Sequence, residues 1–499
     1  MTVAELLREI SPTVPAADTA LARAIECGGV AYDSRRVSPG EIFVALPGRR
    51  ADGAAFAAAA IAAGAAAIVA ERPAAAAVPV PWVTVPDARR ALSALSAAFF
   101  GHPSRELQVV GVTGTNGKTT VSYLVRAILD EAGLSCGLIG TVSYGVGERA
   151  VASTRTTPEA PDLQRLLREM ATAGSRACAM EVSSHALALR RVDGTRFAGA
   201  VFTNLTRDHL DFHAGMDDYF AAKRRLFEML PGDAPAIVNA DDPRGAGMAA
   251  VAARRVTYGI DRTADVAPGP LSYSLDGLEF DVRLPAGSVH VRSRLVGRPN
   301  VYNLLAAVAV TVELGVPLGV VEAGVRRLAG VPGRFELVSG PADDVTVVVD
   351  YAHTDDALRN LLETARPLSP SRIVTVFGAG GDRDRTKRPL MGMVAARLSD
   401  VVVLTSDNPR GEDPDRIIEE VRRGAEPETK RDGADIVSIP DRREAIFYAV
   451  RLAKRGDIVL VAGRGHEREQ EIGDRIVAFD DASVAREALE ARRLSLRAG

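Results

Sequence analysis

A glycine-rich turn near residue 114 carries residue types that bind phosphate. The stretch VVGVTGTNGKTTVSYLV (109–125) passes from one apolar segment through a polar turn into a second apolar segment. The first N–H groups of a helix are unpaired and carry partial positive charge, so such a turn attracts anions. Lys118 can reach the outer phosphates of a nucleotide, and Thr119 can offer a hydroxyl to Mg²⁺. The predicted nucleotide contacts in this turn are Gly114, Thr115, Asn116, Gly117, Lys118, Thr119 and Thr120.

This turn departs from the usual phosphate-loop pattern at one position. Val112 stands where that pattern has its first glycine. An ordinary strand-to-helix turn with an exposed lysine is the alternative interpretation. The combination of strand, glycines, lysine and hydroxyl favours nucleotide binding.

Two more polar groups follow expected strands. Glu181 comes after the strand-like ACAM, where a carboxylate can hold magnesium beside a phosphate loop, although a lone glutamate is more often a cap or an ion-pair partner. The segment NLTRDHLDFH (204–213) brings His209 and His213 four residues apart. The zinc-protease motif needs glutamate where Leu210 stands, so zinc hydrolysis is excluded.

The last third of the chain contains four β-branched runs that each end in a polar loop. They are VTVVVDYAH, RIVTVFGAGG, DVVVLTSDNPR and DIVLVAGRGHE. This pattern predicts a doubly wound sheet, whose ligands bind beyond the carboxyl ends of the strands. Asp350, Arg383, Arg410 and Glu467 are therefore expected to converge. GAGGDR has Arg383 where a dinucleotide fingerprint needs glycine, so nicotinamide chemistry is excluded.

Size and composition set the framework for these motifs. The chain has 499 residues, 47% hydrophobic and 25% charged, which suggests about three α/β units. A net charge of −3 gives no global field that would favour nucleic acid or membrane. The three widely spaced cysteines suggest neither disulfides nor zinc. No signal peptide or membrane span is expected, which makes the cytoplasm the default location.

Short motifs place the expected domain boundaries. We expect a small α/β domain at 1–104, containing the runs EIFVAL, AAIVA and WVTV and an alanine-rich helix. A central P-loop-type ATPase domain with a mainly parallel sheet is expected at 105–331, and a Rossmann-like doubly wound domain at 332–499.

Several short segments occur in one order along the chain: GTNGKTT, EVSSHAL, TNLTRDHLDFH, GRPNVYN, GRFE, DYAHT, GGDRDRTKRP, SDNPR and AGRGHE. Together they resemble the Mur ligases of bacterial peptidoglycan synthesis, and most closely the type that adds meso-diaminopimelate. The resemblance implies an N-terminal domain for the uridine end of the substrate, a central ATPase and a C-terminal domain for the amino acid. It implies ATP and Mg²⁺, an acyl-phosphate intermediate and no covalent enzyme intermediate. A monomer without nucleic-acid or membrane partners is expected.

The resemblance also assigns roles to individual residues. Lys118, Glu181, His209 and Lys223 match catalytic positions, and the last of these is a carbamylated lysine in the family. Thr119 and Glu181 match ligands of one magnesium, while Glu181, His209 and Lys223 match the surroundings of a second. Asn303, Arg334 and Asp350 match positions that touch adenine, phosphate and ribose. The expected contacts of the UDP-linked substrate are Ser34, Arg49, Thr156, Thr157, Ser183 and Arg191. The expected contacts of the amino acid are Arg383, Asp407, Asn408, Pro409, Arg410, Gly463 and Glu467.

The segment DNPR (407–410) bears on which amino acid is added. Meso-diaminopimelate differs from lysine by a second carboxylate, and Arg410 with Arg383 can bind it through paired N–H donors, while Glu467 accepts from the amine. Two positions depart from the family pattern: Leu189 replaces a contacting glutamine, and Asp355 replaces the usual proline. The alternatives are a lysine-adding ligase, a folylpolyglutamate-type ligase and a nucleotide-gated binding protein.

Overall fold

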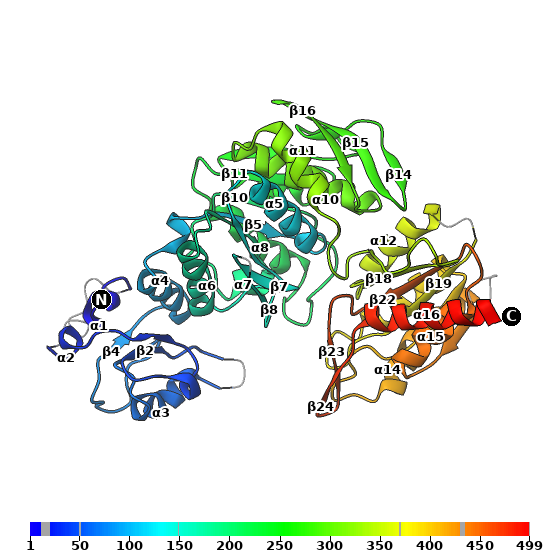
Figure 1. Cartoon of the computed structure of the whole chain (residues 1–499). Coiled ribbons are helices and arrows are strands. Elements are labelled where there is room, and N and C mark those ends of the chain that lie inside the picture. The colour runs from blue at the N-terminus through cyan, green and yellow to red at the C-terminus, as the bar shows by residue number, and fades with distance from the viewer. Residues whose placement is uncertain (11–19, 49–50, 148, 369–370, 430–434, 499) are drawn as a thin grey trace.

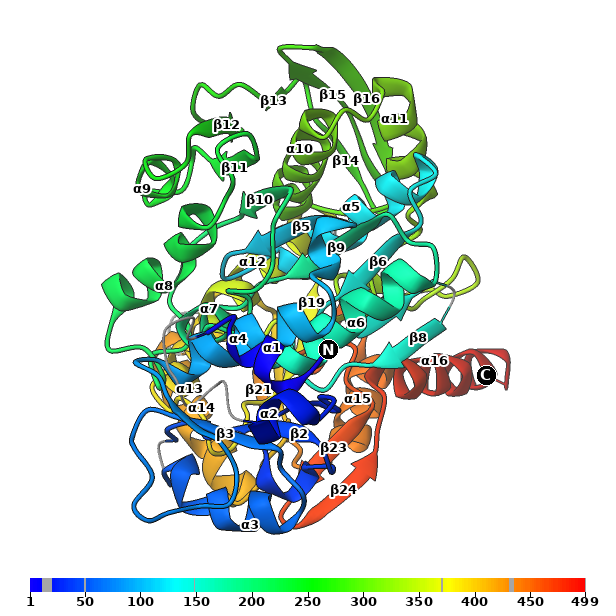
Figure 2. The same cartoon turned by 90° about the vertical axis from the view of Figure 1, so that its left-hand side faces the viewer.

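The computed structural model describes residues 1–10, 20–48, 51–147, 149–368, 371–429 and 435–498. Three sheet-based units form an arch, with the first and the last unit on either side below the middle one (Figure 1). Figure 2 shows the same arrangement from the side. The α/β fold class with three units and mainly parallel sheets, expected from the sequence, is confirmed. None of the described helices combines the length and apolar character needed to cross a bilayer.

The N-terminal unit is a four-stranded parallel sheet in the order β1-β2-β3-β4. The runs EIFVAL, AAIVA and WVTV form β2, β3 and β4, as predicted. Apolar side chains are buried on both faces of this sheet, against α1 and α4 on one face and α3 on the other. Its elements are α1 (Val3–Leu7), α2 (Ala20–Ala24), β1 (Gly29–Ala31), β2 (Glu41–Val44), α3 (Ala57–Ala62), β3 (Ala67–Ala70), β4 (Trp82–Thr84) and α4 (Ala88–Phe99).

The central sheet has eight strands in the order β12-β11-β10-β5-β9-β6-β7-β8. All neighbours are parallel except the pairs β6–β7 and β7–β8. The strands are β5 (Gln108–Thr113), β6 (Cys136–Ile139), β7 (Ser143–Val146), β8 (Arg149–Ala152), β9 (Ala177–Glu181), β10 (Gly199–Phe202), β11 (Pro235–Asn239) and β12 (Arg254–Tyr258). Strand β5, which leads into the glycine-rich turn, lies between β10 and β9. The turn therefore emerges at the middle of the sheet.

Helices cover both faces of the central sheet because its central strands are apolar on both sides. One face packs against α5 (Lys118–Glu131), α10 (Arg298–Glu313) and α11 (Leu318–Arg327). The other packs against α6 (Ala160–Thr172), α7 (Ser184–Ala188), α8 (Met216–Glu228) and α9 (Gly245–Ala249). The three cysteines are free and buried, which confirms that they form no disulfide.

A small antiparallel sheet, absent from the sequence-based predictions, lies beside α11. It contains β13 (Ala267–Pro268), β14 (Ser272–Ser274), β15 (Gly277–Leu284) and β16 (Gly287–Ser293). Buried and exposed residues alternate along β15 and β16, as expected for a sheet with one face against a core. Phe280, Val289 and Val291 join the core that contains α11.

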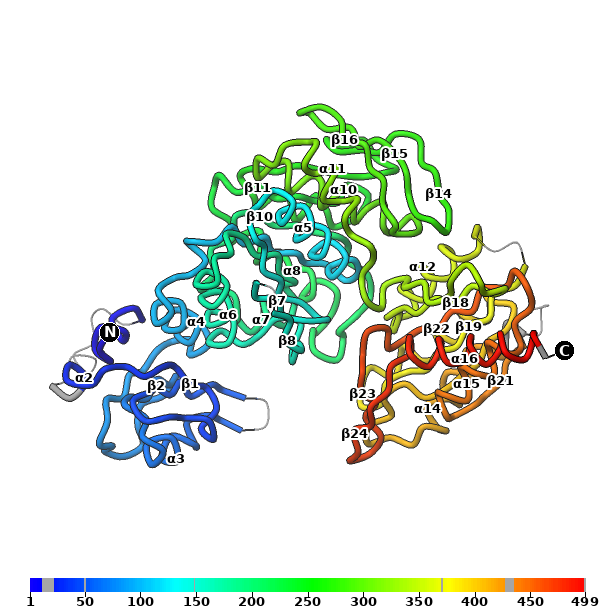
Figure 3. The backbone as a smooth tube through the Cα atoms, viewed as in Figure 1, coloured from blue at the N-terminus to red at the C-terminus, as the bar shows by residue number. Residues whose placement is uncertain are grey.

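The C-terminal sheet has six strands in the order β17-β18-β22-β19-β20-β21, all parallel except β17. The strands are β17 (Glu336–Leu337), β18 (Thr346–Asp350), β19 (Ile373–Phe377), β20 (Val401–Leu404), β21 (Asp435–Ser438) and β22 (Ile458–Ala462). Helices α12 (Asp355–Ala365), α13 (Lys387–Leu398) and α14 (Pro414–Thr429) cover one face, and α15 (Arg442–Leu452) and α16 (Asp481–Ala498) the other. A hairpin of β23 (Glu469–Ile472) and β24 (Arg475–Ala478) follows β22. Figure 3 shows the chain passing once from the middle unit to the last, between α11 and β17.

Candidate active site

The glycine-rich turn connects β5 to α5, so the strand–turn–helix context expected from the sequence is present. Gly114 and Gly117 have φ angles of +150° and +86°. A Cβ at Gly114 would lie 1.8 Å from Thr203 Oγ1, and one at Gly117 would lie 2.4 Å from Asn303 Oδ1. Only glycine fits either position, because it tolerates both the backbone angle and the close approach. The turn thus packs directly against the segments after β10 and at the start of α10.

Two lysines converge on one carbonyl oxygen of this turn. Lys118 Nζ donates to the carbonyl oxygens of Gly114 (3.0 Å) and Thr115 (2.8 Å). Lys223 Nζ, from α8, donates to the same Gly114 oxygen at 2.7 Å and lies 4.5 Å from the ring centre of Tyr219. Burial and the neighbouring Lys118 hold the pKa of Lys223 well below its ordinary value. Burial also lowers the pKa of Lys118. Burial therefore makes the neutral amine easier to reach at Lys223 than at an exposed lysine.

Glu181 ends β9 with its side chain 1% exposed. Its carboxylate accepts from the backbone N–H of Thr141 (2.7 Å) and from the Thr141 hydroxyl (3.1 Å). Thr141 Oγ1 also lies 3.0 Å from Thr156 Oγ1. Glu181, Thr119, Thr156 and Lys118 line one cavity of about 260 Å³. A carboxylate and a hydroxyl therefore face the space beside the phosphate turn.

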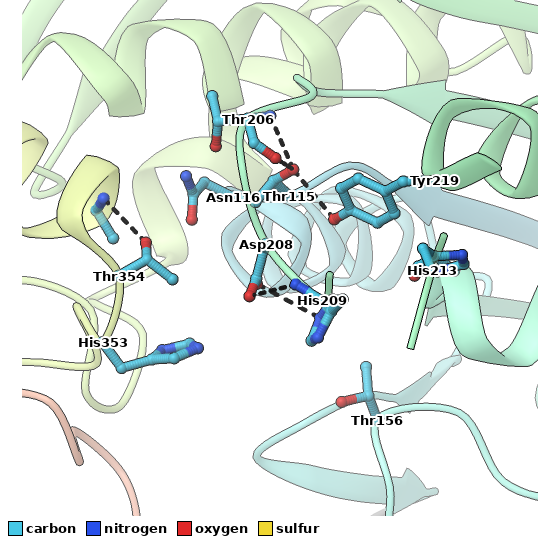
Figure 4. Close-up of polar contacts among 12 residues, drawn as sticks. Thr115, Asn116, Thr156, Thr206, Asp208, His209, His213, Tyr219, His353 and Thr354 are labelled. Atoms are coloured by element: carbon cyan, nitrogen blue, oxygen red, sulfur yellow. Dashed lines mark hydrogen bonds and ion pairs between the residues drawn. The ribbon is translucent and has the colours of Figure 1, made fainter. Parts of the chain in front are cut away.

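Asp208 and His209 extend into this cavity from the segment after β10. The backbone N–H of His209 donates to Asp208 Oδ1 (2.8 Å), and the ring packs edge-on against His185. Burial lowers the pKa of His209 to about 3, so its ring is neutral. Figure 4 shows His353 of the C-terminal unit on the opposite side of the space that Asp208 and His209 face. Asp208 and His353 were not singled out from the sequence, although they belong to the segments TNLTRDHLDFH and DYAHT.

Arg334 and Asp350 of the C-terminal unit and Asn303 of α10 line the cavity beside the phosphate turn. Arg334 Nη2 donates to Thr119 Oγ1 (3.2 Å), and its guanidinium lies 4.5 Å from the ring centre of Tyr351. Asp350 accepts from the backbone N–H groups of residues 335 and 352, which fixes the GRFE turn beside β18. Asn303 lines both this cavity and a neighbouring one of about 610 Å³. The cation–π contact between Arg334 and Tyr351 was not predicted from the sequence.

The residues expected at the UDP-linked substrate lie in separate places. Thr157 and Ser183 are next to each other, with Thr157 Oγ1 donating to the Glu181 carbonyl (2.9 Å). Arg191 is 9% exposed and is already engaged by Glu159 (2.9 Å) and by the Thr157 carbonyl (3.1 Å). Ser34 lies in the N-terminal unit after β1, and the structure gives it no contact with this group. Arg49 lies outside the described residues.

The residues expected at the amino acid come together at one edge of the C-terminal sheet. Asn408 Nδ2 donates to Glu467 Oε2 (2.8 Å). Arg410 pairs with Glu471 (2.8 Å) and donates from Nη1 to the Gly381 carbonyl (2.9 Å). Arg383 is exposed at the end of the same loop as Gly381. This edge is the carboxyl end of four parallel strands, as the sequence pattern predicted.

Close backbone contacts bind these loops to one another. The carbonyl oxygen of Pro409 lies so close to Gly381 that a Cβ on that residue would be only 1.9 Å from it. A Cβ on Gly463 would lie 2.7 Å from Asp407 Oδ2, and Gly463 has a φ of +112°. The loops therefore meet only because glycine stands at both positions.

Among the described residues, no group of three or more His, Cys, Asp or Glu side chains could hold a metal ion. Magnesium does not need such a group, because it keeps several waters and takes ligands from substrate phosphates. The Glu181 carboxylate and the Thr119 hydroxyl are oxygen donors of the type that it prefers, and both face the same cavity. This donor set fits magnesium bound together with a nucleotide.

Comparison with known proteins gives three family matches. Residues 112–311 match the Mur ligase middle domain, residues 333–465 the Mur ligase glutamate ligase domain, and residues 26–100 the Mur ligase family catalytic domain. The UDP-N-acetylmuramoyl-L-alanyl-D-glutamate–2,6-diaminopimelate ligase of Solibacter usitatus is 48% identical over 468 residues, which cover 93% of this chain and 94% of that protein. The protein of the same name from Syntrophomonas wolfei is 44% identical and covers 99% of this chain and 100% of its own length.

A solved structure of a UDP-N-acetylmuramoyl-L-alanyl-D-glutamate–2,6-diaminopimelate ligase is similar over the whole chain. Its TM-score is 0.71 at 36% identity, and the alignment covers 99% of both chains. The likeness therefore extends to the arrangement of all three units.

Proposed function

The chain belongs to the Mur ligase family, and we propose that it uses ATP to join meso-diaminopimelate to UDP-N-acetylmuramoyl-L-alanyl-D-glutamate. The observation that carries the proposal is a pair of sites: a phosphate turn with Glu181 in the middle unit, and a loop cluster with Arg410 in the last. One site suits the activation of a carboxylate, and the other suits the binding of a charged amino acid.

Phosphorylation solves two problems of this reaction. A carboxylate is a poor electrophile, and its condensation with an amine in water is uphill. Transfer of the γ-phosphoryl group of ATP to the D-glutamate carboxylate gives an acyl phosphate and ADP. The amine then attacks the acyl carbon and displaces phosphate, which forms the amide bond. The protein contributes orientation and charge stabilisation.

The nucleotide lies, in this proposal, across the two neighbouring cavities. The N–H groups of residues 117–120, at the start of α5, and Lys118 hold the β- and γ-phosphates, and Arg334 adds positive charge beside Thr119. Asn303 lies between the cavities, and the larger one, near Tyr302 and Arg298, has room for the base and the ribose. Asp350 borders the first cavity.

Thr119 and Glu181 would hold magnesium beside the nucleotide phosphates, where it would supply neutralisation of the phosphoryl charge. We propose further that Lys223 is carbamylated; it lines the same cavity as His209. The depressed pKa of Lys223 supports this, because the neutral amine is the form that reacts with carbon dioxide. Carbamylation would replace a cation by an anion near the metal and relieve the repulsion by Lys118.

Domain roles follow the proposed boundaries. Residues 1–104 hold the uridine end through Ser34 and the GRRADG segment, residues 105–331 hold ATP, and residues 332–499 deliver the amino acid. Thr156, Thr157 and Ser183 border the path to Glu181. Arg191 orders the Thr157 loop through its carbonyl contact, so its contribution to substrate binding is indirect.

One chain supplies every group named here, so the proposed active unit is the monomer. Its proposed location is the cytoplasm, where ATP is available.

Recognition of diaminopimelate rests on charge at the far end of the amino acid. Arg410 has five N–H donors. Its Nε pairs with Glu471 and its Nη1 donates to the Gly381 carbonyl, so the N–H groups of Nη2 remain for a substrate carboxylate. Glu467 and Asp407 lie across the loop cluster and suit the distal ammonium. Lysine would leave Arg410 without its carboxylate, at a cost of about 1–3 kcal/mol.

An activity assay tests the proposal. The purified enzyme is given ATP, Mg²⁺ and UDP-N-acetylmuramoyl-L-alanyl-D-glutamate with either diaminopimelate or lysine at equal concentration. We expect amide formation with diaminopimelate and little with lysine. Equal rates with both amino acids would refute the specificity, and ATP turnover without a new amide bond would refute the ligase.

A further inference from the structure

A fully buried ion pair lies beneath the amino-acid loops. Arg442 begins α15 and Asp481 begins α16, and both side chains are 0% exposed. Arg442 Nε and Nη2 bind the two Asp481 oxygens, each at 2.7 Å. A buried charge must be hydrogen-bonded throughout to be tolerated, and this guanidinium has two further partners.

Those partners are the backbone carbonyls at the start of the two loops. Arg442 Nη1 donates to the Ser406 carbonyl (3.2 Å), one residue before Asp407. Arg442 Nη2 donates to the Ala462 carbonyl (3.0 Å), one residue before Gly463. Strands β20 and β22 are not neighbours, because β19 lies between them. The guanidinium therefore bridges two strand ends across a third strand.

We infer that Arg442, held by Asp481, is a positioning residue that sets the spacing between the Asp407–Arg410 and Gly463–Glu467 loops for the amino-acid substrate. This rests on the proposed function for the identity of that substrate. The two loops touch at Gly463 and Asp407, where a Cβ on residue 463 would lie only 2.7 Å from Asp407 Oδ2, so a small shift of either strand end changes their contact. Asn408 and Glu467, which are joined by a hydrogen bond, would separate with it.

The third loop of the cluster has an anchor of its own on the opposite face of the sheet, in addition to the bond from Gly381 N–H to the Asn408 carbonyl (2.9 Å). Arg388 of α13, whose side chain is 0% exposed, donates to the Gly380 carbonyl (3.1 Å) and pairs with both oxygens of Glu412. Glu412 in turn accepts from the backbone N–H of Asp382 (2.6 Å). A change at Arg442 should thus affect chiefly the spacing between the Asp407–Arg410 and Gly463–Glu467 loops, because the loop that carries Arg383 keeps its bonds to Arg388 and Glu412.

The test replaces the pair by apolar side chains, as Arg442→Met with Asp481→Leu. Exchange of a buried ion pair for apolar residues of similar volume often leaves stability unchanged, so this variant should fold. It removes the donors to Ser406 and Ala462. We expect the KM for diaminopimelate to rise about tenfold or more. We expect the KM values for ATP and for the UDP-linked substrate to stay within about twofold, because their sites lie on other elements.

A matched control lies at the opposite end of the same sheet. Arg492 of α16 pairs with Asp344 through two bonds of 2.8 Å and also donates to the Val450 and Ala453 carbonyls. Arg492→Met with Asp344→Leu should leave the KM for diaminopimelate unchanged. Equal effects of the two double variants would show that both pairs act only on general stability, which would overturn the inference.

Two further measurements keep the inference testable. Arg442→Lys keeps the charge beside Asp481 but cannot reach both carbonyls. If the double variant fails to fold, this single variant should still raise the KM for diaminopimelate above that of the wild type. Hydrogen exchange of the amides in 406–410 and 463–467 should be faster in the double variant than in the wild type, and this result does not depend on which amino acid the enzyme adds. Unchanged exchange and unchanged KM in a folded variant would refute the positioning role. A wild-type enzyme that adds no diaminopimelate would instead refute the proposed function.

Discussion

At the scale of single residues, the site depends on charges placed where water cannot screen them. Lys118 and Lys223 share the Gly114 carbonyl, and burial makes two ammonium groups there unfavourable. The sequence identified both lysines, the first through the turn and the second only through family resemblance. Their common carbonyl could not be predicted, because it depends on how α8 packs beside β5. The same holds for Asp208, whose carboxylate comes under the electrostatic influence of His353 only in the folded chain.

A first prediction concerns Lys223. Removal of carbon dioxide and bicarbonate from the assay should lower activity, since carbamate forms only from the neutral amine. Addition of ¹³C-bicarbonate should restore activity and give a carbamate carbon signal in the NMR spectrum. Lys223→Arg should show neither the signal nor the restoration. Full activity of the wild type in carbon-dioxide-free buffer, with no carbamate signal, would contradict carbamylation.

A second prediction concerns Arg410. Arg410→Ala should raise the KM for diaminopimelate about 10- to 100-fold, the equivalent of about 1.5–3 kcal/mol for a lost charged hydrogen bond. The KM for ATP should change little, because the nucleotide turn lies in the middle unit. Steady-state kinetics with each substrate varied in turn provides the measurement. Arg468→Ala, an exposed arginine one residue after Glu467, serves as the control, and an equal effect there would remove the special role of Arg410.

At the scale of elements, the parallel strand–helix pattern predicted the sheets well, because each β-branched run ends in a polar loop. The predicted convergence of the four C-terminal loops follows from parallel strands alone. The antiparallel β13–β16 sheet was missed, although buried and exposed residues alternate along β15 and β16, and this alternation is the signal that could have found it. Asp355, which stands where proline is usual, begins α12 normally behind the Thr354 cap. That departure therefore leaves the helix start intact.

A third prediction concerns the glycine after β22. Gly463→Ala should raise the KM for diaminopimelate, because its Cβ would lie 2.7 Å from Asp407 Oδ2 on a backbone with φ of +112°. Gly315→Ala has the same kind of backbone strain, with φ of +87°, but meets nothing within 4 Å. Comparison of substrate KM values with thermal midpoints separates the two effects. Both variants should lose some stability, and only Gly463→Ala should lose affinity for the amino acid. An unchanged KM in Gly463→Ala would show that the two loops do not need this contact.

At the scale of the whole molecule, composition predicted three units, but only the structure shows how they meet. The middle and last units touch through few polar contacts, including Asn116 with Asp356 and Arg334 with Thr119. Neither pair could be found from the sequence, since the partners lie more than 200 positions apart. Each partner does belong to a motif or its immediate neighbourhood. Motifs thus predicted the surfaces that meet, although not the atoms.

The last prediction links a histidine cluster to the stability of the molecule. Burial lowers the pKa of His185 to about 4, and its ring packs against His209 and Phe212. The ordinary value is about 6.5, so between about pH 6.5 and 4 the unfolded chain binds a proton that the folded chain resists. The stability that His185 contributes is therefore complete above about pH 6.5 and is lost as the pH falls toward 4.

The measurement is the thermal midpoint of the wild type and of His185→Gln across this pH range. Carboxyl groups titrate in both proteins, so the difference between the two curves isolates the histidine. We expect the wild-type midpoint to fall more steeply than that of the variant between pH 6.5 and 4, with parallel curves above pH 7. Parallel curves over the whole range would mean that His185 titrates alike in the folded and unfolded chains, and the packing of its ring against His209 would then have no electrostatic consequence.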